Sequence, residues 1–169
     1  TGFNMVGVKT AAKLQTAMVV VLLVALGAYI VFGLPKVNFA GFFEPGAIMP
    51  NGFLNFLQAS ALLYFPMGGA KFIAELGGDI ENPGKNIPRS MFLSTGIVAV
   101  FYALMGVVAA GVLPIDQVAG KTLVVSAQEI FPRPIYLFFV IGGALFALAT
   151  TLNGTLSWIT KGLYVAAKE

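Results

Sequence analysis

The sequence contains no cysteine and no histidine, and charged residues are scarce. The two absences exclude disulfide bonds, thiolate chemistry, zinc sites of the cysteine–histidine type and histidine-based catalytic triads. Only 10% of the 169 residues are charged, whereas about a quarter of the residues are charged in an ordinary soluble domain. Hydrophobic residues make up 58% of the chain and the mean hydropathy is +0.89, so the composition indicates an integral membrane protein.

The same absences speak against catalysis. Serines such as Ser60 and Ser94 have no histidine anywhere in the chain to act as a base, and no cluster of metal-ligating residues is visible. We therefore predict that the protein is not an enzyme, that it binds no metal and that it needs no organic cofactor. The chain begins at Thr1 rather than at a methionine, and we interpret it as part of a longer protein.

Charge-free apolar runs predict four membrane-spanning helices, since about 20 mostly apolar residues suffice to cross a bilayer. Turn-forming residues beside aromatic ones separate the runs, and a modestly amphipathic stretch at 118–130 is expected to lie along the membrane surface. The expected segments are spans at about 5–34, 51–76, 90–113 and 135–160, a polar connector at 77–89, and loops at 35–50 and 114–134.

The basic residues predict how the chain is oriented. Seven of the ten lysines and arginines lie near the two ends of the chain or in and beside the 77–89 connector. Because cytoplasmic loops are enriched in basic residues, we expect both ends and this connector on the cytoplasmic side of the plasma membrane. The loops at 35–50 and 114–134 are then extracellular.

The second span is interrupted. Residues 46–70 carry no charge, yet Pro66 is closely followed by Gly68 and Gly69, so the helix is expected to open at about 64–69. In hydrocarbon, opened backbone is tolerated only where it lines a cavity or packs against protein. The interruption therefore predicts a binding site, and a proline kink that fills a packing gap is the alternative.

A specific succession of residues follows the break: Gly69, Glu75, Asp79, Asn82-Pro83, Lys85 and Ile87-Pro88-Arg89. It resembles the sixth span and the following loop of the amino acid-polyamine-organocation transporters. Further matches are Asn4 with Gly7-Val8-Lys9, Tyr102 with Leu113-Pro114, and Thr150-Thr151-Leu152-Asn153 with Leu163-Tyr164. The resemblance covers essentially the whole chain. It implies the fifth to eighth of about twelve spans, in the five-plus-five inverted-repeat fold of leucine-transporter-like proteins.

The resemblance also implies a substrate site at the break, where opened carbonyls hold an ammonium group and a half-helix N-terminus faces an anionic one. The substrate-binding residues predicted at the break are Tyr64, Phe65, Met67, Gly68 and Gly69, together with Lys71, which departs from the acidic residue of many family members. Lys71 has two interpretations. It either neutralises an acidic group of the substrate or forms an ion pair with Glu75, four residues along the same helix face.

Ion coupling is implied at Lys9. In proton-coupled members the lysine of this segment occupies the place of a sodium ion, and a buried ammonium group loses its proton more readily than an exposed one. The alternative is an interfacial lysine whose ammonium group reaches the cytoplasm, as expected for Lys13. Thr150 and Thr151 are predicted to be hydroxyl neighbours of Lys9, or sodium ligands if sodium is the coupling ion.

The remaining charged and turn-forming residues are predicted to act in gating or structure: Glu75, Asp79, Asn82, Pro83 and Arg89. Together these features predict secondary active transport of an amino acid or related small organic ion by alternating access, coupled to protons. The expected partners are that substrate, the lipid bilayer and the remaining helices of the transporter, with no nucleic acid. The competing class is a non-transporting membrane receptor or accessory helical bundle in which the break is only a kink.

Overall fold

The computed structural model describes residues 8–44, 47, 49–75, 78 and 80–166, and all regular elements within them are helices. These helices are α2 (Val8–Gly33), η1 (Leu34–Lys36), η2 (Phe39–Phe43), α3 (Gly52–Met67), η3 (Gly68–Lys71), α4 (Phe72–Glu75), α5 (Pro83–Val112), α6 (Ile115–Val118), α7 (Val124–Ile130), α8 (Arg133–Phe138), η5 (Phe139–Leu145) and α9 (Phe146–Ala166). The all-helical part of the prediction is confirmed.

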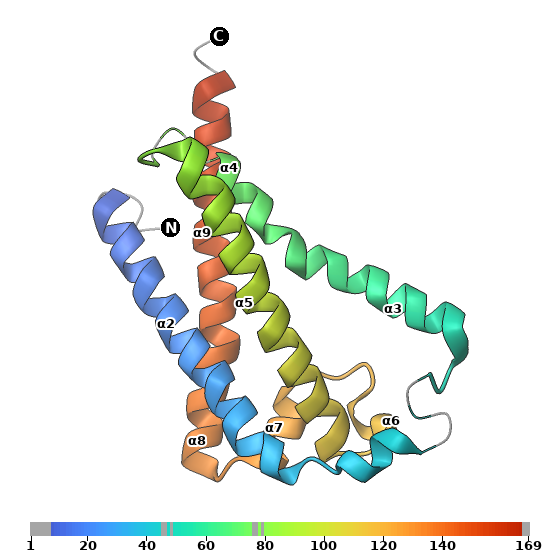
Figure 1. Ribbon diagram of the computed structural model, residues 1–169. Coiled ribbons are helices and arrows are strands. Elements are labelled where there is room, and N and C mark those ends of the chain that lie inside the picture. The colour runs from blue at the N-terminus through green and yellow to red at the C-terminus, as the bar shows by residue number, and fades with distance from the viewer. Residues whose placement is uncertain (1–7, 45–46, 48, 76–77, 79, 167–169) are drawn as a thin grey trace.

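The long helices form a bundle from which one helix diverges. Helix α2 packs against α5, η5 and α9, and Figure 1 shows these elements side by side. Helix α3 leaves the bundle at α4 and points away from α5 along most of its length. The start of α5, helix α4 and the last turns of α9 lie at one end of the molecule, while α6, α7 and α8 lie at the other.

Among the residues that the structure describes, three helical segments are long and apolar enough to cross a membrane: Lys13–Lys36, Pro83–Val112 and Arg133–Leu156. Each contains a charge-free apolar run that the sequence already marked as a span. Helix α3 is shorter, with 16 residues, which corresponds to about 24 Å of helix. The predicted count of four spans is therefore not established by the described helices.

The third span begins earlier than predicted. Pro83 is the first residue of α5, so 83–89, which we expected in the connector, form the first turns of this 30-residue helix. The N-terminal position suits Pro83, because the first amide groups of a helix have no partner inside it. Pro88 lies in the second turn, where the carbonyl that loses its partner belongs to Gly84, an exposed residue.

The buried core lies at the end of the bundle that contains α7. Its fully buried members include Tyr29 of α2 and Val108 of α5, and Tyr29 stacks on Phe139 at 5.3 Å between ring centroids. A Cβ atom at Gly33 would collide with a methyl group of Val108, so only glycine permits this approach of α2 to α5.

The 118–130 stretch does not form one amphipathic helix on the surface. It divides at Gly120, which has a φ of +70°, and only Val124–Ile130 forms the helix α7. Ser126, Ala127 and Ile130 of α7 are buried, because the helix packs against α2 and α5. The apolar positions that suggested contact with a membrane surface are used for contact with the bundle.

Candidate functional site

The predicted break is present as a change of helix type, and it begins later than expected. Helix α3 continues through Pro66 to Met67, and the tighter η3 then occupies Gly68–Lys71 before α4. Proline at position 66 costs only the bond to the carbonyl of Leu62, an exposed residue, whereas two successive glycines weaken the helix itself. The helix geometry therefore changes at the glycines. A 3₁₀ stretch within a helix often marks a functional hinge.

The break lies where α3 joins the bundle. The η3 segment contacts α5, and α4 contacts both α5 and α9. Gly69 is exposed and Gly68 half-buried, and among the described residues no heavy atom of another part of the chain lies within 4 Å of a Cβ built at either glycine. Within the described structure the backbone at this point is uncovered.

The six predicted substrate residues lie close together along the chain, but most of their side chains are not described. Tyr64 lies on α3 with 76% of its surface exposed. Phe65 and Met67 follow on α3, and Lys71 ends η3, but their side chains lie outside the described part of the structure. The same holds for the side chain of Glu75, so the expected pairing with Lys71 stays a prediction.

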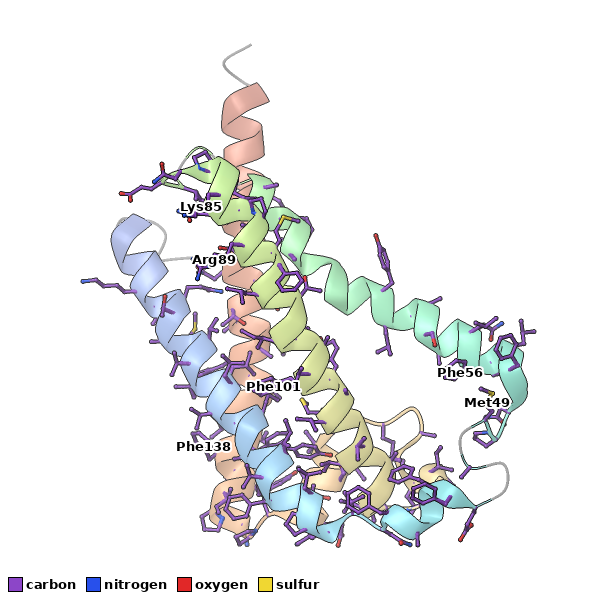
Figure 2. All side chains as sticks on the ribbon, in the orientation of Figure 1. Met49, Phe56, Lys85, Arg89, Phe101 and Phe138 are labelled. Carbon is purple, nitrogen blue, oxygen red and sulfur yellow. The ribbon has the colours of Figure 1, made fainter. Side chains whose placement is uncertain are left out.

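The predicted gating residues lie at the end of the bundle where α5 begins. Asp79 lies outside the described residues. Asn82 has a φ of 48°, in the left-handed region, and its carbonyl accepts the amide hydrogens of Lys85 and Asn86 at 3.0 Å each. Arg89 is exposed on the second turn of α5. Figure 2 shows Lys85 and Arg89 at this end of the bundle, far from Phe56 on the diverging α3 and from Met49, which precedes α3.

The two threonines predicted to take part in ion coupling lie on α9. Thr150 is only 8% exposed and Thr151 is exposed, and both hydroxyls donate to the carbonyl of Ala147, at 3.0 and 2.8 Å. Lys9 lies in the second position of α2, and its side chain is outside the described part. The contact between Lys9 and the threonines therefore stays a prediction.

A polar contact that sequence reasoning did not single out joins α2 to α9. The side-chain amide of Gln15 donates to the backbone carbonyl of Thr150 at 3.2 Å, and the amide of Asn153 donates to the side-chain oxygen of Gln15 at 2.8 Å. The available signal was a carboxamide in each of two apolar runs. A single sequence does not reveal that two such residues lie opposite each other.

The profile of the amino acid permease family matches residues 1–169. An uncharacterized protein of Methanocaldococcus jannaschii is 30% identical over 172 residues, which cover 100% of this chain and 39% of that protein. The amino-acid permease RocE of Bacillus subtilis is 30% identical over 162 residues, 90% of this chain and 34% of the relative.

A more distant relative is the mitochondrial cationic amino acid transporter 3 of Arabidopsis thaliana, 24% identical over 92% of this chain and 26% of that protein. No solved structure matches the chain with comparable significance. The chain thus spans between a quarter and two fifths of the length of these relatives. Because the family profile covers every residue of the sequence, the chain belongs to the amino acid permease family.

Proposed function

We propose that this chain is part of a secondary transporter that moves an amino acid or a related small organic ion across the plasma membrane by alternating access. The observation that carries the proposal is the helix break at Gly68–Lys71 in a member of the amino acid permease family. Opened or tightened backbone in a spanning segment supplies carbonyl and amide groups for a ligand where hydrocarbon supplies none. The remaining helices of an inverted-repeat fold would complete the site.

The break offers a polar, accessible backbone together with side chains suited to a small amphiphilic molecule. Tyr64, Phe65 and Met67 would contact the apolar part of the substrate, and the backbone of Gly68 and Gly69 would bind its charged groups. Lys71 would then neutralise an acidic group, which favours zwitterionic or acidic substrates over the cationic ones in the name of the Arabidopsis relative. Glu75, Asp79, Asn82, Pro83 and Arg89 would form the cytoplasmic gate around the start of α5.

The test is uptake by the full-length protein in proteoliposomes. A panel of radiolabelled amino acids of each charge class is supplied with and without an imposed proton gradient, and sodium is tested separately. A transporter accumulates one class above its external concentration when the gradient is present. A receptor or accessory bundle binds the ligand but shows no uptake that depends on protein, and that result would refute the proposal.

Coupling is proposed to involve Lys9, with Thr150 and Thr151 as its hydroxyl neighbours. Replacing Lys9 by alanine removes the group that would release and regain a proton, so uptake should lose its dependence on pH. Lys13→Ala, four residues along the same helix, is the matched control and should keep that dependence. Persistence of the wild-type pH dependence in Lys9→Ala would assign the coupling proton to another residue.

A further inference from the structure

Gln15 of α2 forms hydrogen bonds with α9 at two points one helical turn apart, at Thr150 and at Asn153. Thr150 and Asn153 are separated by three positions, so they lie on the same face of α9. Gln15 meets the first through its backbone carbonyl and the second through its side chain, at 3.2 and 2.8 Å. A single carboxamide on α2 therefore restricts both the sliding and the rotation of α9.

Farther along α2, its packing against η5, the segment that precedes α9, is apolar and close. A Cβ at Gly142 would lie 3.2 Å from Val21, and one at Gly143 would lie 3.9 Å from Ala25. As positions on α2 rise from Gln15 to Ala25, their partners fall from Asn153 to Gly142 and Gly143, so the two segments are antiparallel, as Figure 1 shows. Van der Waals contact of this kind allows small shifts along the axis, whereas directed hydrogen bonds do not.

The turn that Gln15 holds is the one that carries the two threonine hydroxyls. Both hydroxyls are fixed on the carbonyl of Ala147, within one turn of the carbonyl that Gln15 contacts. Lys9 lies six residues before Gln15 on the same helix, which is about 9 Å along the helix axis. The height of Lys9 relative to the threonines is thus set by the contact that Gln15 makes.

We propose that Gln15 is a positioning residue for ion coupling: by holding the Thr150 carbonyl and the Asn153 side chain, it fixes the register of α9, and so of its threonine hydroxyls, relative to the part of α2 that carries Lys9. The inference rests on the proposed transport function. Gln15 bonds both to the Thr150 carbonyl and to the Asn153 side chain, so its loss removes two directed contacts between α2 and α9. Loss of either should affect the coupled step more than substrate recognition at Gly68–Lys71.

The experiment compares two transport modes of the full-length protein in proteoliposomes. Accumulation driven by an ion gradient requires coupling, whereas counterflow exchange of substrate at equal ion concentrations requires only binding and alternation. Gln15→Ala removes two hydrogen bonds and should lower gradient-driven accumulation by at least about threefold to tenfold, the factor that corresponds to one of them, and change the half-saturation concentration in counterflow by less than about twofold. Gln15→Met, with similar length and no amide, should behave in the same way if the alanine variant is poorly folded.

Rescue distinguishes positioning from a general loss of stability. Asn153→Ala should cause part of the loss, because the bond from Gln15 to Thr150 remains, the double alanine variant should lose less than the sum of the two single losses, and exchange of the pair (Gln15→Asn with Asn153→Gln) should restore accumulation. Gln117→Ala, on the exposed side of α6, is the matched control and should leave both modes unchanged. Wild-type protein without accumulation would refute the proposed function, whereas an equal loss in both modes in Gln15→Ala and Gln15→Met would refute the role of Gln15 alone.

Discussion

Tyr29 is a fully buried polar residue in the core of the bundle. Its side chain is completely buried, and its hydroxyl lies 2.6 Å from that of Ser126 on α7. The Ser126 hydroxyl donates its hydrogen to the carbonyl of Leu123, so Tyr29 is the donor to Ser126. The same tyrosine ring stacks on Phe139, and it therefore joins α2 to α7 and to the π-helical η5.

Tyr29→Phe should lower the free energy of unfolding by about 1 kcal/mol, the net value of one buried hydrogen bond. The ring contact with Phe139 survives the change, and Ser126 keeps its bond to Leu123. Thermal unfolding in detergent measures the effect. Tyr102→Phe is the matched control, because the Tyr102 hydroxyl has no hydrogen-bond partner among the described residues; equal stability of the two variants would contradict this role for the Tyr29 hydroxyl.

For single residues, the sequence predicts local backbone features better than contacts between distant residues. The glycines and the proline around 66–69 indicate a break, because their backbone preferences are properties of the residues themselves. The partners of Gln15, Tyr29 and Gly33 depend instead on which helices become neighbours. Nothing in the sequence distinguishes Gly33, which lies against Val108, from Gly96, which has open space around it.

Among the elements, α7 is a short helix that is fastened at its C-terminal end. The ammonium group of Lys36 donates to the carbonyls of Glu129 and Ile130 at 2.7 and 3.0 Å. The last carbonyls of a helix have no partner inside it and carry partial negative charge, so a lysine placed there stabilises the end of α7. The residue comes from η1, immediately after the first long helix, and so links the two predicted external loops.

Lys36→Met should loosen α7 without disturbing the long helices. Amide hydrogen exchange of 124–130 should become faster by up to about thirtyfold, because interactions of a charge with a helix terminus contribute about 0.3–2 kcal/mol. Hydrogen–deuterium exchange followed by mass spectrometry measures it. Lys121→Met removes an exposed lysine from the same loop and should leave the exchange unaltered; no difference between the two variants would show that Lys36 does not hold α7.

The boundaries of the helices show which physical rules are sufficient to predict a helix from the sequence. Charge-free runs predict α2, α5 and the 133–166 helical segment, because length and hydropathy decide whether a helix can span a bilayer. The start of α5 at Pro83 and the continuation of α3 through Pro66 were missed, since proline is compatible with helix wherever its absent amide is not needed. The burial of α7 depends on tertiary contacts and is invisible to an amphipathicity pattern.

For the whole molecule, the diverging α3 is the most informative feature. Residues Gly52 to Tyr64 are all exposed, although most are apolar, and Asn55 and Ser60 donate to the carbonyls of Asn51 and Phe56 at 2.9 Å each. A mostly apolar helix with this exposure belongs in lipid or against other helices. The relatives that the chain matches are more than twice as long as the chain.

The central claim is that the break at Gly68–Lys71 contributes to the substrate site. Gly69→Leu in the full-length protein tests it, because a Cβ atom at this position meets no described atom of another part of the chain within 4 Å. Gly96→Leu on α5 has the same open surroundings and is the matched control. Membrane insertion of both variants is checked by their amounts in the purified membrane fraction.

The decisive measurement is substrate uptake by proteoliposomes that contain equal amounts of wild-type protein and of each variant. We expect Gly69→Leu to insert normally but to show no uptake, because the leucine side chain fills the space beside the backbone that binds the substrate. Gly96→Leu should transport as the wild type does. Uptake by Gly69→Leu at the wild-type rate would contradict the assignment of the substrate site to the break.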